Sequence, residues 1–426
     1  MDTKQLHQVF LQCSTVSTDT RKITPGSLFF ALRGENFDAN SFAAEALAKG
    51  AEAVVIDNPQ YKTDDRCILV PNTLHALQLM AAEHRRYLGL PIIALTGSNG
   101  KTTTKELINV VLSKKYRTGA TAGNLNNHIG VPLTLLSFTS ETEIGIVEMG
   151  ANHQKEIALL CEIAAPDYGY ITNFGKAHLE GFGGVEGVIA GKSEMYDYLY
   201  AGHKTAFVNA DDEIQMSRTS GLATFTFGSK SNADLVIDEM SANPLVRIKF
   251  AGMEVRSNLI GSYNAPNICA AIAIGTYFGV DKTDICNAIE SYVPSNNRSQ
   301  LMQRGTHQII LDAYNANPTS MVAALDNLTQ LDAHSKVAIL GDMFELGEES
   351  AAEHLEVARH ACTLPLHAIW FVGKEFASHQ GTLHSGKCFK TFEEAAQELA
   401  NHKFPPSTIL IKGSRGMALE RLLEHL

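Results

Sequence analysis

Short apolar runs alternate with longer amphipathic segments along most of the chain. Residues 92–95 form an apolar run that predicts a buried strand, and residues 107–112 carry apolar side chains at helical spacing. Residues 144–147 and 168–172 predict two further strands, and both end beside polar residues. This alternation is typical of an α/β fold in which helices flank parallel sheets, and ligands of such folds bind where the strands end.

A second alternating series near the C-terminus predicts a separate doubly wound unit. Its strands are expected at residues 337–340, 369–372 and 408–411, and its helices after Glu349, Phe392 and Met417. The polar segment 294–299 is the expected linker before this unit, and the segment before His84 is expected to form a unit of its own. We therefore predict three domains, at residues 1–83, 84–297 and 298–426.

Composition and charge narrow the possible partners. The 426 residues are 45% hydrophobic and 19% charged, as in ordinary globular proteins, and the net charge of -11 opposes non-specific binding to nucleic acid or anionic membranes. The seven cysteines include no CxxC pair, which indicates reduced thiols. No secretory signal is apparent, and the longest nearly apolar stretch, 268–280, is shorter than the roughly 20 residues that span a bilayer. We expect a cytoplasmic protein that binds neither nucleic acid nor membrane.

A phosphate-binding loop is the strongest motif in the sequence. The run TGSNGKTT at 96–103 lies between a predicted strand and a predicted helix. Glycines let the backbone approach phosphate oxygens, Lys101 can neutralise the β- and γ-phosphates, and Thr102 offers an oxygen to Mg²⁺. The candidate ATP-binding residues of this loop are Gly97, Ser98, Asn99, Gly100, Lys101, Thr102 and Thr103. ATP binding alone does not name a reaction, because kinases, ATPases, GTPases and ligases all use such a loop.

The short form of this loop, with only two residues between Gly97 and Gly100, resembles that of the Mur ligase and folylpolyglutamate synthase superfamily. Runs that resemble Mur ligase central-domain signatures are NLNNHIGVP at 124–132, EMGA at 148–151, TNFGKAHLE at 172–180, AGKSE at 190–194 and NADD at 209–212. Runs similar to the family's uridine-nucleotide domain are STDTR at 17–21, PGSLFFALRG at 25–34 and DANSF at 38–42. The resemblance covers nearly the whole chain and implies an N-terminal α/β uridine-nucleotide domain, a central P-loop ATPase-like parallel-sheet domain and a C-terminal Rossmann-like domain.

Three C-terminal runs narrow the resemblance within the family. They are DAYNANPTSM at 312–321, GDMFELG at 341–347 and KGSRG at 412–416, and they resemble the members that add D-alanyl-D-alanine to UDP-N-acetylmuramoyl-tripeptide. The resemblance implies a monomeric ligase of peptidoglycan synthesis that uses ATP and two Mg²⁺ ions and forms an acyl phosphate. The alternatives are the preceding amino-acid-adding ligase, whose Asp-Asn-Pro-Arg signature is missing, a folylpolyglutamate-like synthase, and a nucleotide-regulated binding protein on a degenerate scaffold. Intact Lys101, Glu148, His178 and Lys192 argue against degeneracy.

The resemblance also assigns roles to single residues. It implies catalytic roles for Lys101, Glu148, His178 and Lys192, with Thr102, Glu148, His178 and a carbamoylated Lys192 as metal ligands. Without it, Glu148 would be interpreted as a strand-end cap and Lys192 as a surface lysine on a helix. Asn267 is assigned to adenine, Asp312 to the ribose and Arg298 to the phosphates. The candidate substrate residues are Asp19, Thr20, Arg21, Arg33, Asp38, Asn124, Asn126, Asn127, Asn315 and Asn317, of which Asn315 and Asn317 could serve either the nucleotide or the dipeptide.

Three short segments depart from the family pattern. Ala39 and Asn40 replace a usual Gly-His pair beside Asp38. Tyr263 stands where histidine is usual, and Arg298 lacks the glycine that commonly precedes it. The first departure concerns the expected uridine site, and the other two concern the expected nucleotide site.

Overall fold

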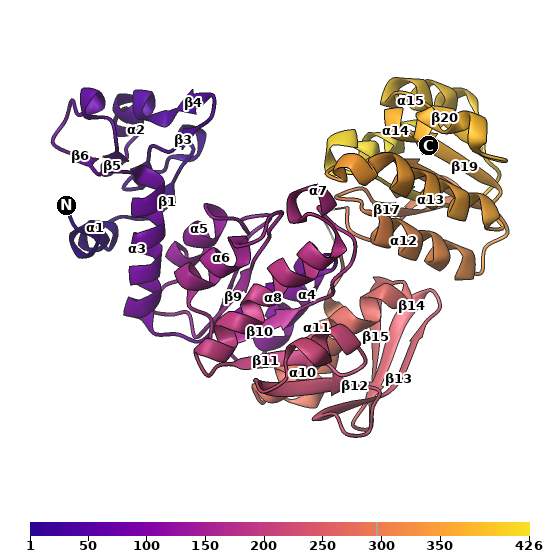
Figure 1. The fold of residues 1–426 in the computed structure, drawn as a ribbon, viewed down its shortest axis with the longest axis horizontal. Helices are drawn as coiled ribbons and strands as arrows, with labels where there is room; N and C mark the ends of the chain where they lie inside the picture. Colours follow the sequence, from indigo (N-terminus) through magenta and orange to yellow (C-terminus); the bar gives the residue numbers. More distant parts are fainter. Residues whose placement is uncertain (295–296) are drawn as a thin grey trace.

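The computed structural model describes residues 1–294 and 297–426, which form an α/β architecture of three units (Figure 1). The units are built on a four-stranded, a nine-stranded and a six-stranded sheet, and the first unit carries a two-stranded ribbon as well. In Figure 1 the first unit is indigo and violet, the central unit runs from purple to salmon, and the third is orange to yellow. The α/β class and the three-unit organisation predicted from the sequence are confirmed.

The first unit is a parallel sheet between two layers of helices. Its strands lie in the order β1 (Val16–Ser17), β2 (Leu28–Phe30), β5 (Ala53–Ile56) and β6 (Cys67–Leu69). Neighbouring side chains of β2 point to opposite faces. Phe29 joins the core under α2 (Ala43–Ala48), and Phe30 joins the core under α1 (Thr3–Phe10) and α3 (Thr73–Leu88). The remaining elements are β3 (Arg33–Gly34), β4 (Phe37–Asp38) and the 3₁₀ helices η1 (Thr20–Lys22), η2 (Ala39–Phe42) and η3 (Pro59–Tyr61).

Helix α3 connects the first unit to the central unit without a break. It packs against α1 on one side and against α5 (Gly130–Leu136) and α6 (Glu156–Ala164) of the central unit on the other. A single hydrophobic core therefore runs from Phe10 through Met80 to Val131 and Leu160. The boundary predicted at residue 84 lies within α3, where the two units share this core.

The central unit surrounds the nine-stranded sheet. Its strands lie in the order β15 (Met253–Ile260), β14 (Leu245–Phe250), β13 (Leu235–Ala242), β12 (Ala223–Gly228), β11 (Thr205–Asn209), β10 (Tyr168–Ile171), β7 (Ile92–Thr96), β9 (Ile144–Glu148) and β8 (Thr118–Ala120). Its helices are α4 (Lys101–Leu112), α5, α6, α7 (Leu179–Phe182), α8 (Val185–Ala201), α9 (Glu213–Arg218), α10 (Ala265–Tyr277) and α11 (Lys282–Ser291), with the 3₁₀ helix η4 (Ser262–Asn264) before α10. The strands predicted at 92–95, 144–147 and 168–172 are β7, β9 and β10.

The central sheet is parallel over most of its width and carries an antiparallel extension at one edge. Strand β13 runs parallel to β12, but β14 and β15 are antiparallel to their neighbours. In β14, buried Val246, Ile248 and Phe250 alternate with exposed Arg247 and Lys249. Antiparallel strands tolerate water on one face, so this extension needs helices on only one side, and α10 and α11 cover it there. Most of the apolar stretch 268–280 forms the buried helix α10.

The third unit is the predicted doubly wound domain. Its strands lie in the order β16 (Gln300–Arg304), β17 (His307–Asp312), β21 (Thr408–Lys412), β18 (Lys336–Gly341), β19 (Ala368–Val372) and β20 (Lys387–Phe389), and all but β16 run parallel. Its helices are α12 (Pro318–Gln330), α13 (Ser350–Thr363), α14 (Lys374–Ser378) and α15 (Phe392–Asn401). Its 3₁₀ helices are η5 (Gly347–Glu349), η6 (Gln380–Thr382), η7 (Arg415–Met417) and η8 (Leu419–His425), so the helix predicted after Met417 is a 3₁₀ helix.

Two further predictions concern the linker and membranes. Of the predicted linker 294–299, positions 295 and 296 lie outside the described residues. Within the part of the chain that the structure describes, no helix combines the length and the apolar character that crossing a membrane requires.

Candidate active site

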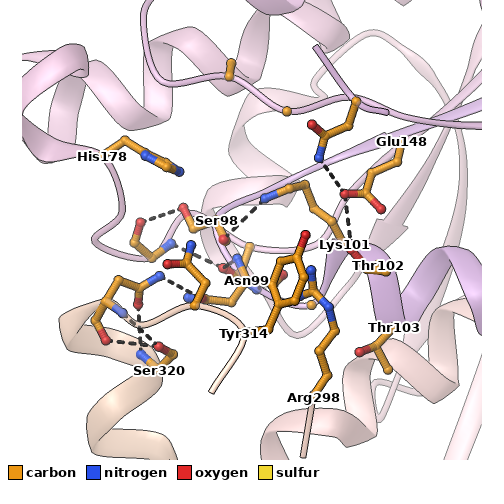
Figure 2. Close-up of a pocket in the computed structure, with 18 of the residues that line it drawn as sticks. Ser98, Asn99, Lys101, Thr102, Thr103, Glu148, His178, Arg298, Tyr314 and Ser320 are labelled. Atoms are coloured by element: carbon orange, nitrogen blue, oxygen red, sulfur yellow. Dashed lines mark hydrogen bonds between the residues drawn. The ribbon is translucent and has the colours of Figure 1, made fainter. Parts of the chain in front are cut away.

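A cavity of about 850 Å³ lies between the central and third units (Figure 2). Its central wall consists of the phosphate loop and the loops that follow β8, β9 and β10. Its opposite wall is formed by Arg298, the segment around Asn315 and the end of β21. The cavity therefore lies at the carboxyl ends of two parallel sheets, where ligands of α/β folds bind.

The phosphate loop requires glycine at two positions because neighbouring side chains leave no room. Gly97 has a φ of 141°, and a Cβ atom there would lie 1.9 Å from Oγ1 of Thr172. Gly100 has a φ of 79°, and a Cβ atom there would lie 2.6 Å from Oδ1 of Asn267. Helix α4 begins at Lys101, so its first N–H groups face the cavity that the loop lines. This geometry suits a bound phosphate chain.

Lys101 is the half-buried cation of this loop. Its Nζ donates a hydrogen bond of 2.7 Å to the carbonyl oxygen of Gly97 (Figure 2). Burial lowers the pKa of Lys101, the carboxylate of Glu148 opposes that effect, and Arg298 adds to it. A desolvated cation at this position interacts strongly with an anion, because water does not screen it.

Glu148 at the end of β9 has the surroundings of a metal ligand. Its Oε1 accepts hydrogen bonds from Thr102 Oγ1 at 3.2 Å and from Asn126 Nδ2 at 2.8 Å. Its Oε2 is buried and has no hydrogen-bond partner among the described residues, which is costly for a carboxylate oxygen unless a ligand supplies the partner. Oxygen ligands of this kind suit Mg²⁺. Residues 1–294 and 297–426 contain no group of three or more His, Cys, Asp or Glu side chains that could hold a metal, so Mg²⁺ here would keep waters and phosphate oxygens.

The other two predicted metal ligands are His178 and Lys192. His178 lines the cavity, but Figure 2 shows its imidazole on the opposite side of the phosphate loop from Glu148. Lys192 in α8 is 1% exposed, which contradicts its interpretation as a surface lysine. Its Nζ lies 5.1 Å from the ring centre of Phe182. Burial, followed by the nearby charge of Lys101, holds the pKa of Lys192 well below its ordinary value, against the opposing effects of Glu156 and Glu194.

An ion pair and a cation–π pair lie on the cavity wall that the third unit forms. Asp312 and Lys412 end the neighbouring strands β17 and β21, and their Oδ2 and Nζ atoms lie 2.6 Å apart. The guanidinium of Arg298 stacks on Tyr314, with 3.8 Å between Cζ and the ring centre. The backbone N–H of Ser299 donates to the second oxygen of Asp312, so the segment at Arg298 is held beside the strand ends.

Asn267 lies under the phosphate loop. It accepts a hydrogen bond of 3.1 Å from Thr104 and donates one of 2.9 Å to Asn264. Tyr263, at the position where the family usually has histidine, lines the same cavity and lies 2.9 Å from Oγ of Ser299. Burial raises the pKa of Tyr263, so this departure places a neutral hydroxyl near the nucleotide wall.

The central and third units meet through polar contacts around the loop 173–178. Lys176 donates to Glu353 through Nζ at 2.6 Å and to Thr319 through its backbone N–H at 3.0 Å. Asn317 Nδ2 donates to Asn99 Oδ1 at 2.7 Å. An apolar contact accompanies them: Leu179 and Phe182 of α7 belong to the same core as residues of α12 and β18.

The predicted substrate residues fall into two groups. Asn126, Asn127, Asn315 and Asn317 line the cavity, whereas Asn124 is exposed outside it. Asp19, Thr20, Arg21, Arg33 and Asp38 lie in the first unit, away from the cavity. The structure therefore does not bring the two groups into a single pocket.

Asn40 shows how the first departure from the family pattern is accommodated. Its side chain is fully buried and donates to Asp38 at 2.7 Å and to Asp57 at 2.9 Å. Arg33 lies 2.8 Å from Asp57 and 3.7 Å from Asp38. Asn40 therefore holds the two carboxylates together beside Arg33, so this cluster persists without the usual histidine.

Sequence reasoning missed several residues of the cavity. Those with polar or aromatic side chains include His153, Glu156, Tyr314, Thr319, Ser320 and Lys412. Lys412 had a usable signal, since it ends a predicted strand in the same sheet as the strand that Asp312 ends, and the ends of parallel strands meet at one edge. No such signal marks His153, which lies in the loop after β9, or Glu156, the first residue of α6, because the sequence does not predict the path of the chain between β9 and α6.

Comparisons with known proteins agree with this arrangement. Three family models match the chain: the Mur ligase family catalytic domain at residues 12–85, the Mur ligase middle domain at 95–275 and the Mur ligase glutamate ligase domain at 297–415. The UDP-N-acetylmuramoyl-tripeptide--D-alanyl-D-alanine ligase of Bacillus subtilis is 35% identical over 96% of this chain and 92% of its own length. A crystal structure of MurF from Acinetobacter baumannii is 33% identical, with a TM-score of 0.89 over 99% of this chain and 97% of that one. The MurF ligase of Thermotoga maritima, solved in complex with ADP, is 27% identical, with a TM-score of 0.84 over 98% and 97% of the two chains.

Proposed function

Because the chain belongs to the Mur ligase family, we propose that it uses ATP to join D-alanyl-D-alanine to UDP-N-acetylmuramoyl-tripeptide in the synthesis of peptidoglycan precursors. The observation that carries this proposal is the cavity, in which a complete phosphate loop faces the segment 312–320 of the third unit. The relatives with D-alanyl-D-alanine ligase activity in their names match the chain over nearly its whole length. The preceding amino-acid-adding ligase is the alternative within the same chemistry.

The reaction begins when the terminal carboxylate of the tripeptide attacks the γ-phosphate of ATP, which gives an acyl phosphate and ADP. Lys101 and the N-terminal N–H groups of α4 stabilise the charge on the transferring phosphoryl group. The free amine of D-alanyl-D-alanine then attacks the acyl carbonyl, the amine loses a proton, and phosphate leaves as the amide forms. The relative solved with ADP supports a nucleotide at this loop.

The remaining nucleotide contacts follow from the cavity walls. Asn267 supports the adenine assignment because it lies beneath Gly100. The Asp312 carboxylate, which Lys412 holds at the end of β17, would accept hydrogen bonds from the ribose hydroxyls. Arg298, stacked on Tyr314, keeps N–H groups free for phosphate oxygens. Asn315 and Asn317 stand between the nucleotide wall and the phosphate loop, so we assign them jointly to ATP and the dipeptide.

Two Mg²⁺ ions are part of the proposal. Glu148 and Thr102 would hold one of them, as the unpartnered Oε2 of Glu148 suggests, and His178 would hold the other on the far side of the loop. Bound Mg²⁺ neutralises phosphate charge and orients the γ-phosphate for attack. Asn126 positions the Glu148 carboxylate by donating to the oxygen that also contacts Thr102.

We also propose that Lys192 is carbamoylated. Carbon dioxide reacts with a neutral amine, and the lowered pKa of buried Lys192 supplies one. The product is an anion near Lys101 that offers hard oxygen atoms, the type of ligand that Mg²⁺ prefers. The modification would thus place a negative charge where Lys101 attracts it.

The uridine end of the substrate is assigned to the first unit, at the cluster of Arg33, Asp38 and Asp57 and at the loop of Asp19 to Arg21. The Arg21 guanidinium holds the pKa of Asp19 at about 2, so this carboxylate is ionised at neutral pH. The substrate would extend from there along α3 and α6 to the cavity (Figure 1). We propose that the chain acts as a cytoplasmic monomer on these small molecules, and its seven free cysteines agree with a reducing compartment.

The test measures inorganic phosphate and the mass of the product with purified full-length protein. Phosphate release that requires ATP, UDP-N-acetylmuramoyl-tripeptide and D-alanyl-D-alanine together is expected. If the protein instead adds a free diamino acid, in preference to D-alanyl-D-alanine, to the precursor that carries one amino acid fewer than the tripeptide, it is the preceding ligase. Phosphate release with folate and glutamate would identify a folylpolyglutamate-like synthase, and nucleotide binding without any turnover would identify a binding protein.

A further inference from the structure

His178 and Glu345 face each other across the border between the central and third units. Nδ1 of His178 lies 2.5 Å from Oε2 of Glu345, a close charged contact that is not aligned as a ring N–H hydrogen bond. Both residues have left-handed backbones, with φ values of 54° and 63°. Left-handed conformations are strained for residues other than glycine and persist where the surrounding structure enforces them, often at functional sites. His178 and Glu345 both have this backbone conformation and contact each other at the edge of the cavity, which indicates that the surrounding structure enforces their positions.

The loop that carries Glu345 is fixed by the third unit. The backbone N–H of Met343 donates to Nε2 of the buried His354 at 2.9 Å, and that of Phe344 donates to Oγ of Ser414 at 2.9 Å. Asp342, just before them, accepts hydrogen bonds of 3.0 Å from the backbone N–H groups of Glu375 and Phe376. The backbone on the N-terminal side of Glu345 is therefore anchored at three successive residues.

The loop that carries His178 is held by the same unit. Lys176, two residues earlier, contacts Glu353 and Thr319. Glu180, two residues later, packs so closely on Gly347 that a Cβ atom on Gly347 would lie 2.8 Å from the Glu180 side chain. His178 belongs to the central unit by sequence, but the contacts that fix its position come from the third unit.

We propose that Glu345 is a positioning residue that orients the imidazole of His178 for its role toward Mg²⁺, an inference that rests on the proposed function. A carboxylate at Nδ1 places the ring proton there and leaves the lone pair on Nε2, the nitrogen available to a metal ion. The carboxylate also fixes the plane of the ring. Because Glu345 comes from the third unit, this half of the metal site is complete only when the third unit is docked.

The first experiment reads the ring of His178 directly, without turnover. Full-length protein labelled with ¹⁵N-histidine is compared with Glu345→Ala by NMR, and the His178 signals are assigned with His178→Gln. The wild type is expected to carry the His178 proton on Nδ1, and Glu345→Ala is expected to shift the ring toward the Nε2–H tautomer. Glu348→Gln, which changes an exposed acid three residues away, is the matched control and should leave the tautomer unchanged. An unchanged tautomer in Glu345→Ala would overturn the proposal.

The second experiment separates positioning from an independent role. Loss of a residue that orients a metal ligand typically costs about 10–100-fold in activity or metal affinity, so Glu345→Ala should lower kcat by that factor and raise the Mg²⁺ requirement. In a His178→Ala background, Glu345→Ala should lower kcat by less than about twofold, because the ring that Glu345 positions is gone. Effects that multiply in the double variant would show that Glu345 acts without His178 and would overturn the proposal. A wild type that joins no dipeptide would instead refute the proposed function, while the tautomer comparison still decides the contact.

Discussion

The side-chain amide of Asn317 donates a hydrogen bond of 2.7 Å to Oδ1 of Asn99. Asn317 also caps the first turn of α12, because its own Oδ1 accepts from the backbone of that turn. One asparagine thus connects the phosphate loop of the central unit to a helix start in the third unit. Phosphate binding at the loop and docking of the third unit are therefore structurally coupled.

Substitution of Asn317 should separate these two roles. Asn317→Ser keeps a side chain that can cap α12 but is too short to reach Asn99, so thermal stability should stay close to that of the wild type while the KM for ATP rises roughly fivefold, the value of one hydrogen bond. Asn317→Ala should also lose the cap, at a cost of about 1 kcal/mol in unfolding free energy. Thermal melts and initial rates measure the two effects. An equal KM in Asn317→Ser and wild type would mean that the contact with Asn99 does not matter for ATP.

Lys101 and Lys105 offer a matched pair, one turn apart on α4. Lys101→Ala should retain the fold and lose ligation by at least about 10²-fold, because the lost cation stabilises transferring charge. Lys105 is 1% exposed and donates to the carbonyl oxygen of Thr121, so Lys105→Ala should chiefly lower the melting temperature. Phosphate release and circular dichroism distinguish the outcomes. Normal turnover by folded Lys101→Ala would contradict the assigned role.

The carbamate on Lys192 can be detected through its carbon. Protein equilibrated with ¹³C-bicarbonate, Mg²⁺ and nucleotide should show a carbamate signal that is absent from Lys192→Ala. That variant should lose most activity and regain part of it with added acetate, which supplies oxygen ligands. Lys192→Arg should not be rescued, because a guanidinium keeps its charge and cannot be carbamoylated. Full activity in Lys192→Ala, or no carbamate signal in the active wild type, would exclude the modification.

The contact between the first and central units should weaken in mild acid. His7 and His84 are buried 3.1 Å apart, and Nε2 of His84 contacts the carbonyl oxygen of Phe138 at 2.9 Å. Burial lowers the pKa of both rings, and His84 further lowers that of His7. A lowered folded-state pKa means that their stabilising effect is complete above the unfolded-state pKa of about 6.5 and is lost as the pH falls toward the folded-state values.

The measurement is the difference in melting temperature between about pH 7.5 and pH 5.5. His7→Phe, which removes one of the two buried bases, should make this difference smaller. His75→Asn, at an exposed histidine of the same helix as His84, is the control and should leave the difference as it is in the wild type. A larger pH dependence in His7→Phe would contradict the expected loss of stability on protonation of the two rings.

The sequence predicted those features whose cause is local. The phosphate loop and the strands β7, β9 and β10 follow from a few neighbouring residues, because glycine spacing and apolar runs act over short distances. The antiparallel strands β14 and β15 were missed, although the alternation of apolar and polar residues in β14 is the pattern of a strand with one face in water. The pairing of Asn99 with Asn317 joins residues 218 positions apart, and nothing in either local sequence specifies the other.

The burial of Lys192 does not follow from composition. Composition favours an exposed lysine on a helix, and only the packing of a separate segment, α7 with Phe182, covers this one. The family resemblance singled out Lys192, but its burial and lowered pKa depend on tertiary contacts that a single sequence does not contain.

The position of Phe182 links the burial of Lys192 to the docking of the third unit. The residue lies in the hydrophobic core shared with the third unit, while its ring faces the amine of Lys192. Docking of the third unit therefore helps to keep water from the lysine and favours the neutral amine that carbon dioxide requires. Coupling between two binding events is reciprocal, so where docking promotes carbamate formation, carbamate formation promotes docking to the same extent. Dissolved carbon dioxide would then act as an effector of domain closure, and its concentration would shift the population of the closed enzyme.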